Sequence, residues 1–248
     1  METWRLITTW GAAPGFNMGL DEALLENADA PPTLRLYTWS PDTLSLGYFQ
    51  RHEEVRGTRP DADLRPPGCI VRRITGGGAI HHTGELTFSI AAPLDHRLYA
   101  GPVPGSYRRV HHVVAAALAR HGVHAELRGA APALSDRADT GMCFHHSTPL
   151  DLVWEGRKGV GSAQRRRGGR VLHHGSIKLH SSDLEDEIAV VDPAGDGPGP
   201  EELGATLRET FERVLGVHLE AGVPTAEERA RALELGRRYL DPEFVRRR

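Results

Sequence analysis

The stretch Arg72-Arg-Ile-Thr-Gly-Gly-Gly-Ala-Ile-His-His82 carries three consecutive glycines between two arginines and two histidines. Such a run of glycines lets the backbone turn sharply and brings bare N–H groups close to a ligand. Arg72 and Arg73 supply positive charge that suits a carboxylate, a phosphate or a phosphopantetheine. The segment lacks the Gly-Lys-Ser/Thr of a P-loop and the G-x-G-x-x-G spacing of a dinucleotide site. It predicts a ligand-binding loop; the alternative is a hairpin or bulge whose glycines serve only the turn.

The composition is that of an ordinary folded chain: of 248 residues, 39% are hydrophobic and 25% charged. Lys+Arg (30) and Asp+Glu (33) nearly cancel, so no global basic field indicates a nucleic acid or an acidic membrane surface as partner. No stretch approaches the roughly 20 apolar residues of a membrane span, and the first residues do not have the pattern of a signal peptide. We therefore expect a cytoplasmic enzyme without nucleic-acid or membrane partners.

Periodicity predicts a mixture of strands and helices. Alternating apolar and polar residues predict strands over 33–39 and 43–49, separated by a turn at 40–42. Helical spacing predicts one helix over 18–26, with Asn17 as its N-cap, and a second from Ser106 that ends at Gly122. Further strands are expected over 69–74, 86–91, 150–154 and 170–179. These elements predict an α/β fold with an α+β mixed sheet.

The amino-acid composition changes after residue 190. We expect a single domain with a core over about 1–191, a Gly/Pro-rich loop over 192–200 and a short helical tail over 201–248. In that tail one helix is closed by Gly216, and a last helix opens with the capping-box spacing of Thr225 and Glu228. The three arginines at 246–248 are expected to form a solvated end.

A second cluster, over 155–164, holds Lys158 among small residues after a predicted strand, and the chain contains only one other lysine, Lys178. A chain that otherwise uses arginine for positive charge has reason to place a compact ammonium here; a surface lysine in a loop is the alternative. Farther along, His173 and His174 are adjacent in a predicted strand and should point to opposite faces.

The two cysteines have different surroundings. Cys69 lies in an apolar strand and is expected to be a small buried hydrophobe. Cys143 lies among glycine, threonine and histidines, where a neighbouring cation would favour a thiolate nucleophile, although an inert thiol is the alternative. The histidine pairs diverge on any strand or helix, and no His-Glu-x-x-His or Cys-x-x-Cys occurs, so no metal site is expected.

Together these segments resemble the lipoate–protein ligase and octanoyltransferase superfamily, which shares its catalytic domain with biotin–protein ligases. The similarity runs from about residue 15 to about residue 215, in ordered blocks over 17–25, 32–50, 72–89, 157–164 and 173–175. The block over 17–25 resembles the family's first helix, and 32–50 its first hairpin. The resemblance implies a ligase-type catalytic domain with a core like that of class II aminoacyl-tRNA synthetases.

Cys143-Phe144 and Gly84-Glu-Leu-Thr-Phe-Ser89 resemble the LipM-type octanoyltransferases, in which the cysteine accepts an octanoyl group from acyl carrier protein as a thioester. In contrast, Thr75-Gly-Gly-Gly-Ala79 is closer to the loop of the ATP-dependent ligases. The octanoyltransferases often have arginine as the third of these loop residues. The resemblance implies Cys143 and Lys158 as catalytic residues. It implies acyl or substrate contacts from Arg72, Arg73, Thr75, Gly76, Gly77, Gly78, Ala79, His82, Gly161, Ser162, Ala163 and His174, and an apolar tunnel lined by Ile74, Ile80 and Val160.

The implied reaction moves an octanoyl or lipoyl group from acyl carrier protein, through Cys143, to a lysine of a lipoyl domain. Such domains occur in the glycine cleavage H protein and in dehydrogenase E2 subunits. No cofactor is expected, with ATP and Mg²⁺ needed only by the alternative, a lipoate ligase that acts through lipoyl-adenylate. A non-catalytic subunit of a split ligase and lipoyl transfer between lipoyl domains are further alternatives. Arg165-Arg-Arg167 is the expected basic patch for an acidic protein partner, or else a solvated turn.

Overall fold

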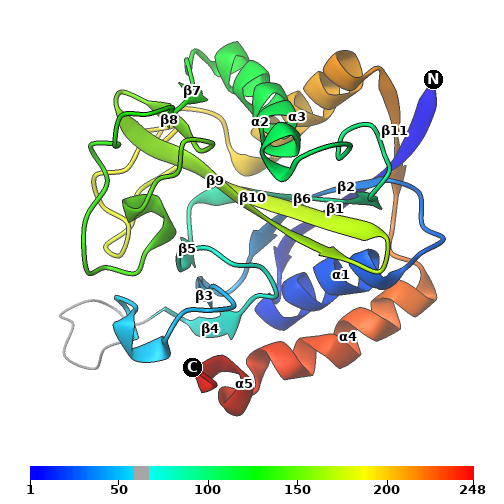
Figure 1. The fold of residues 1–248 in the computed structure, drawn as a ribbon, viewed down its shortest axis with the longest axis horizontal. Helices are drawn as coiled ribbons and strands as arrows, with labels where there is room; N and C mark the ends of the chain where they lie inside the picture. The colour runs from blue at the N-terminus through cyan, green and yellow to red at the C-terminus, as the bar shows by residue number, and fades with distance from the viewer. Residues whose placement is uncertain (59–66) are drawn as a thin grey trace.

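An eight-stranded mixed sheet runs through the centre of the computed structural model, which describes residues 1–58 and 67–248 (Figure 1). Two pairs, β11 with β1 and β1 with β2, are parallel, and the other neighbours are antiparallel. Its order is β11 (Val217–Gly222), β1 (Glu2–Ala12), β2 (Thr33–Trp39), β6 (Glu85–Pro93), β10 (Arg170–Lys178), β9 (Arg157–Arg167), β8 (Leu152–Trp154) and β7 (Glu126–Leu127).

A second, three-stranded sheet is formed by β4 (Cys69–Arg72), β3 (Thr43–Leu46) and β5 (Ile80–His82). The chain enters it from β2 through the short turn at 40–42, so the turn connects two sheets. The expected hairpin of the first two predicted strands is therefore wrong, because β1 and β6 occupy both edges of β2 and β3 pairs elsewhere. A short 3-10 turn, η1 (His52–Glu54), follows the small sheet's first strand.

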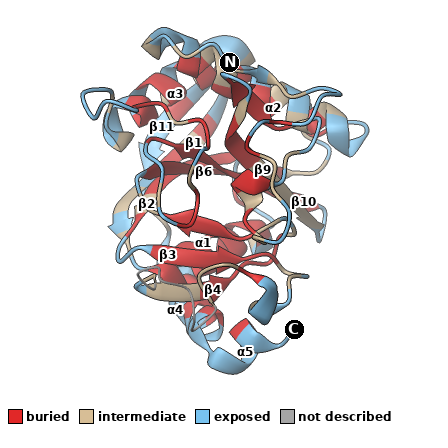
Figure 2. Ribbon diagram, turned by 90° about the vertical axis from the view of Figure 1, so that its left-hand side faces the viewer, coloured by how far each residue is buried: buried red, intermediate tan, exposed pale blue. Residues whose placement is uncertain are grey.

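Helices cover both faces of the large sheet, which gives three layers (Figure 1). On one face, α2 (Val103–Leu118) and α3 (Pro200–Leu215) bury apolar side chains against strand residues such as Leu34, Leu36 and Phe88. On the other, α1 (Pro14–Glu26) and α4 (Ala226–Leu240) pack against Ile7 and Tyr37. In Figure 2 the buried residues gather along the sheet and the helix faces that meet it, and much of the exposed surface lies in loops and in α5 (Pro242–Arg246).

In β2 apolar and polar residues alternate, but the polar residues do not face solvent. Leu34 and Leu36 join the core under α2 and α3, while Arg35 points to the other side and is fully buried. There its guanidinium forms an ion pair of 2.9 Å with Asp21 of α1. The polar positions of this strand therefore face a buried polar network between the sheet and α1.

The first helix begins earlier than the sequence pattern indicates. α1 starts at Pro14, whose fixed φ and missing N–H suit the first turn of a helix. Asn17 is consequently inside the helix, and its side chain donates hydrogen bonds to the carbonyls of Ala12 and Thr38. The prediction of Asn17 as N-cap is wrong for this reason.

The segment after residue 200 packs against the rest of the fold and contributes a strand to the large sheet. Between α3 and α4 the chain adds β11 to the edge of the large sheet, a strand that the sequence pattern did not predict. The left-handed Gly216 at the end of α3 and the capping box of Thr225 and Glu228 are confirmed. At the chain's end, Arg72 donates to the carbonyl of Val245, and Arg247 lies 4.0 Å from the ring centroid of Tyr48. Arg246, Arg247 and Arg248 are all exposed, as expected of a solvated end.

Within the described residues, no helix combines the length and the apolar character needed to span a membrane. Two 3-10 turns complete the elements, η2 (Ala119–His121) after α2 and η3 (Cys143–His145) between β7 and β8.

The closest approach of two helices supplies a test of the packing. A Cβ on Gly19 of α1 would lie 2.1 Å from the carbonyl oxygen of Ala232 in α4, a backbone atom that cannot swing away. We expect Gly19→Ala to push the helices apart and to lower the free energy of unfolding by about 1–3 kcal/mol.

Gly105→Ala in α2 is the matched control, because its Cβ would meet first the mobile guanidinium of Arg109, at 3.3 Å. Urea unfolding of both variants measures the difference. Equal unfolding midpoints for the two variants would contradict this account of the α1–α4 contact.

Candidate active site around Cys143

Cys143 is brought to the glycine loop by a pair of backbone hydrogen bonds. Its N–H donates to the carbonyl of Ala79 (2.6 Å), and the N–H of Ala79 donates to the carbonyl of Gly141 (2.9 Å). A Cβ on Gly78 would lie 2.8 Å from both the N and the Cα of Cys143, so this approach requires glycine there. The glycine loop and the cysteine, more than 60 residues apart in the chain, thus form one site.

Lys158, from β9, reaches the same cysteine. Its Nζ lies 3.4 Å from Cys143 Sγ and donates to the carbonyls of Cys143 (2.8 Å) and His146 (3.0 Å). It also forms an ion pair of 2.9 Å with Asp151, and both side chains are buried. Burial opposes the charged form, but the nearby Cys143 and Asp151 outweigh it and raise the pKa of Lys158. The arrangement places a cation beside the sulfur.

Sequence reasoning missed Asp151. The residue lies just before β8, and β8 pairs with β9 so that Val153 is opposite Lys158. A carboxylate directly before the strand that pairs with the lysine strand was the available signal, but the register of that pair could not be read from the sequence.

Gly161 keeps the space between lysine and cysteine open. A Cβ at this position would lie 3.2 Å from Lys158 Nζ and 3.3 Å from Cys143 Sγ. A side chain here would therefore separate the two groups, which explains a glycine in the middle of a strand.

A mainly apolar cavity opens beside the sulfur. Residues from α1, β2, the glycine loop, β9 and β10 line it, and the sequence had singled out many of them. The lining comprises Met18, Tyr37, Trp39, Arg73, Gly76, Gly77, Ile80, His82, Thr87, Cys143, Gly161, Ser162, Ala163, His174, Gly175 and Ser176.

An open groove lies on the other side of Cys143. It shares Gly76, Gly77, Cys143, Ser162 and Ala163 with the cavity. Its further lining is Gly78, Tyr107, His146, Thr148, Leu150, Asp151, Lys158 and Gln164. The cysteine therefore lies where the cavity meets an open, accessible groove.

The prediction that His173 and His174 point to opposite faces is confirmed. His174 lines the cavity, with Nε2 2.7 Å from Thr75 Oγ1 and Nδ1 3.1 Å from Asp21 Oδ2. His173 faces α2, where its Nε2 lies 2.9 Å from Ser162 Oγ, and burial lowers the pKa of His173 well below its usual value. One histidine belongs to the cavity wall and the other to the support behind it.

That support is a chain of hydrogen bonds with defined directions. His111 Nδ1 lies 2.5 Å from the carbonyl of Leu150 and must donate to it, so its Nε2 accepts from the hydroxyl of Ser162 (2.7 Å). Ser162 Oγ then accepts from His173 Nε2, and His173 Nδ1 accepts from Gln164 Nε2 (3.1 Å). The chain links α2, β9 and β10 behind the groove and fixes the carbonyl next to Asp151.

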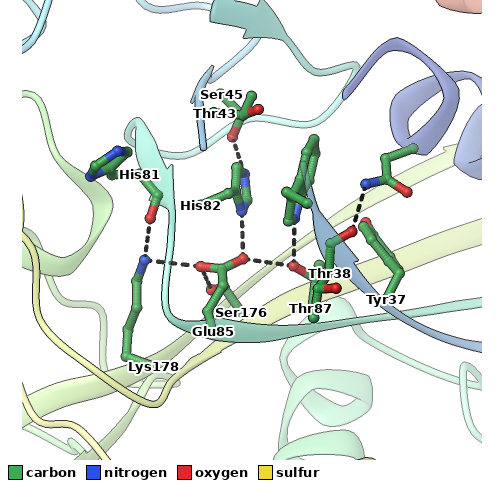
Figure 3. Close-up of polar contacts among 12 residues, drawn as sticks. Tyr37, Thr38, Thr43, Ser45, His81, His82, Glu85, Thr87, Ser176 and Lys178 are labelled. Carbon is green, nitrogen blue, oxygen red and sulfur yellow. Dashed lines mark hydrogen bonds and ion pairs between the residues drawn. The ribbon is translucent and has the colours of Figure 1, made fainter. Parts of the chain in front are cut away.

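His82 is held as a wall of the cavity (Figure 3). Its Nδ1 lies 2.5 Å from Glu85 and its Nε2 2.7 Å from Ser45 Oγ, and its ring stacks on Trp39 at 4.0 Å between centroids. Burial lowers the pKa of His82 despite the neighbouring carboxylate. With both nitrogens engaged, this imidazole is well placed to shape the cavity.

Glu85 is the centre of this network (Figure 3). It accepts hydrogen bonds from Thr87 (2.6 Å), Ser176 and Lys178 (2.9 Å). Lys178 is buried as well and pairs with Glu185 at 2.6 Å. Both lysines of the chain are therefore buried in ion pairs.

Several residues that were expected to contact the substrate bind other parts of the protein. Arg72 is fully buried and donates to the carbonyls of Gly47, Gln50 and Val245, so it ties the small sheet to the chain's end and does not line the cavity. Thr75 contacts His174, and Ala79 acts through its backbone.

Arg73 does reach the cavity, where it supports the glycine loop. It donates to the carbonyls of Gly76 (3.0 Å), Gly78 (2.5 Å) and Ser45 (2.8 Å). Of the expected tunnel residues, Ile80 lines the cavity. Ile74 and Val160 do not, because their side chains pack into the two main hydrophobic cores.

The three arginines of the expected basic patch at 165–167 contact different parts of the protein. Arg167 pairs with Glu22 and Glu26, and Arg166 is hydrogen-bonded to Ser106 and Gln164. Arg165 lies 5.5 Å from the ring centroid of Tyr48. In the ranges 1–58 and 67–248, no group of three His, Cys, Asp or Glu side chains is arranged to hold a metal ion.

Comparison with known proteins identifies relatives of this architecture. Curated relatives named octanoyltransferase LipM match this chain. The one from Moorella thermoacetica is 39% identical over 231 residues, covering 90% of this chain and 82% of its own. The one from Kyrpidia tusciae is 35% identical over 280 aligned positions, covering 98% of each chain.

Solved structures share the fold at lower identity. Lipoate-protein ligase A bound with ATP superposes with a TM-score of 0.75 at 24% identity, over 99% of both chains. A bi-partite lipoate protein ligase from Thermoplasma acidophilum gives 0.75 at 21%, over 99% of this chain and 97% of its own. The α/β ligase-type fold expected from the sequence is confirmed.

The family model for the lipoyl protein ligase A/B catalytic domain matches residues 13–197, a range that contains Cys143, Lys158 and the glycine loop. The resemblance stated from the sequence is thereby confirmed, and this protein belongs to the lipoyl protein ligase A/B catalytic-domain family.

Proposed function

We propose that this protein is an octanoyltransferase of protein lipoylation that works through a thioester on Cys143. The observation that carries the proposal is Cys143 Sγ, 3.4 Å from Lys158 Nζ, at the junction of the apolar cavity and the open groove. A sulfur nucleophile beside a buried cation is what acyl transfer from a thioester requires. Relatives named octanoyltransferase LipM, 35–39% identical, support the same activity.

The reaction divides into two steps that use the same sulfur. In the first, the Cys143 thiolate attacks the carbonyl carbon of the octanoyl thioester, and the donor leaves as a thiolate that takes a proton from water. In the second, a neutral lysine amine attacks the acyl-enzyme, an amide bond forms, Cys143 leaves as a thiolate and the amine loses a proton to water. Lys158 is placed to stabilise the negative charge that develops in both steps.

The cavity and the groove suit the two ends of the substrates. An octanoyl tail placed in the apolar cavity would bury six or seven methylenes, worth up to roughly 5 kcal/mol at about 0.8 kcal/mol each before ordering costs. The groove is open to solvent and admits first the arm of a donor and then the lysine of an acceptor. The fixed imidazoles of His82 and His174 would border the acyl chain.

The proposed donor is acyl carrier protein, and the proposed acceptors are lipoyl-domain proteins such as the glycine cleavage H protein or dehydrogenase E2 subunits. The family to which the chain belongs supports the acceptors. The proposal needs no cofactor and places the enzyme in the cytoplasm, as expected from the sequence.

The covalent step has a direct test. After incubation with octanoyl acyl carrier protein, we expect the intact mass of the protein to rise by one octanoyl group, and the mass to return when a lipoyl domain is added. Cys143→Ala should acquire no octanoyl group and lose transfer, while Cys69→Ser should behave as wild type. If Cys143→Ala still transferred octanoyl groups at the wild-type rate, the thioester route would be wrong.

The ATP-dependent ligase reaction is the competing function, since the loop Thr75–Ala79 resembles that of ligases and solved ligases share the fold. An adenylate route needs no nucleophilic thiol, so the Cys143–Lys158 contact favours the transferase. Pyrophosphate release on adding lipoate, ATP and Mg²⁺ would support the ligase. Turnover by the purified single chain would exclude a non-catalytic subunit.

The assignment of the cavity to the acyl chain predicts a change of chain length. Met18 lines the cavity from α1 and belongs to the core between α1 and the sheet. We expect Met18→Trp to fill part of the cavity and to lower kcat/KM for octanoyl donors at least tenfold relative to butanoyl donors. Competition between the two thioesters, read by the mass of the acyl-enzyme, measures the ratio. An unchanged ratio in a folded variant would place the acyl chain elsewhere.

A further inference from the structure

Lys158 Nζ is surrounded by acceptors of hydrogen bonds. The oxygen atoms of Cys143 (2.8 Å), Asp151 (2.9 Å) and His146 (3.0 Å) lie around it, with Cys143 Sγ at 3.4 Å. An ammonium has three protons to donate and no lone pair, whereas a neutral amine would turn a lone pair toward one of these oxygens. The set of acceptors therefore matches the ammonium form.

Only two of these acceptors can carry a negative charge, the Cys143 sulfur and the Asp151 carboxylate. The other titratable groups of the surroundings supply none: burial lowers the pKa of His111 and raises that of Tyr107 to about 12. Arg73, the other cation near Cys143, donates to the loop carbonyls. Asp151 is the carboxylate paired with Lys158 in the described part of the chain.

Of the two negative charges beside Lys158, only that of Asp151 persists through the whole proposed reaction. When Cys143 becomes a thioester its charge disappears, while Asp151 is unchanged. Lys158 is 2% exposed, and an ammonium so buried loses its proton readily unless an opposite charge stays close. In the acyl-enzyme, Asp151 is therefore the group that keeps Lys158 charged.

We propose that Asp151 is a positioning residue that holds Lys158 as an ammonium throughout the cycle, so that Lys158 stabilises charge without transferring a proton. The inference rests on the proposed function. The proton balance agrees with it: Cys143 starts and ends as a thiolate, the donor thiolate gains one proton from water, and the attacking amine gives one proton to water. No proton has to pass through Lys158.

Asp151 is itself held by the backbone around it. Its carboxylate accepts from the N–H of Thr148 (2.7 Å), and its carbonyl accepts from the N–H of Arg128 (2.9 Å). The neighbouring carbonyl of Leu150 is bound by His111 at 2.5 Å. A carboxylate anchored in this way can fix the position of the lysine as well as its charge.

The protonation of Lys158 can be measured directly, because the chain has only two lysines. Protein labelled with ¹³C at lysine Cε, in a Cys69→Ser background, is S-methylated at Cys143 so that the sulfur is uncharged as in the acyl-enzyme. We expect the Lys158 signal to keep its ammonium shift from pH 6 to pH 9. With Asp151→Asn added, it should titrate within this range, while the Lys178 signal stays constant.

The kinetic test separates the two half-reactions. Acyl-enzyme formed from an octanoyl thioester is mixed with a lipoyl domain, and the rate of transfer is compared between wild type and Asp151→Asn. Because the variant loses the ammonium as pH rises, the wild-type to variant ratio should grow with pH and reach about 100-fold at pH 9, the effect of losing one oxyanion donor. Asp151→Glu should restore most of the rate.

Asp136→Asn is the matched control. Asp136 also anchors this region, accepting from the N–H groups of Ser147 (2.7 Å) and Ala133 (3.0 Å), but it is not paired with Lys158. It should leave the pH dependence of transfer unchanged. An ammonium that persists to pH 9 in Asp151→Asn, or a rate ratio independent of pH, would overturn the proposal. If wild type accepts no acyl group, the proposed function fails, and the NMR titration still decides the role of Asp151.

Discussion

The site depends on one backbone contact, the hydrogen bond from the N–H of Cys143 to the carbonyl of Ala79. It joins the small sheet, which carries the glycine loop, to the segment that precedes β8. The contact is short enough that Gly78 cannot carry a side chain. It is the direct link between the cysteine and the glycine loop, and Lys158 on β9 holds the carbonyl of the same residue. Gly78 is therefore explained first by packing, and through packing by chemistry.

Burial of charge is the second organising feature. Between the sheet and α1, Asp21 is shared by Arg35, Tyr37 and His174. In the network of Figure 3, Glu85 joins His82 to Lys178. Each of these groups would be costly to bury alone, and each has a partner. The cavity wall is thereby built of polar side chains whose nitrogens and oxygens are already engaged, which leaves an apolar lining for a ligand.

The sequence predicted the parts of this structure that local chemistry determines. Short patterns predicted the helix that ends at Gly216, the helix that begins after Thr225, and the opposite directions of His173 and His174. The family resemblance predicted that Cys143 and Lys158 belong to one site. The pairing of strands that are distant in the chain could not be predicted from the sequence. Whether 43–46 pairs with β2 or with a second sheet depends on which edges other strands occupy.

The same limit explains the site residues that were missed or misplaced. Asp151 meets Lys158 through a strand register with a bulge, which no local pattern reveals. Arg72 was expected to bind substrate because arginines beside glycines often bind anions, yet its guanidinium is occupied by three carbonyls, one of them near the end of the chain. An arginine's partners are set by tertiary structure, and its position in a motif does not decide them.

The two lysines have one more consequence. Both are buried, at 2% and 1% exposure, and each is paired with a carboxylate. A protein proposed to pass acyl groups to lysine amines thus offers no accessible lysine side chain of its own. Arginine, which supplies nearly all the other positive charge of the chain, does not take an acyl group under these conditions because it stays protonated. Under the proposed function, this composition keeps the protein's own side chains from accepting the acyl group.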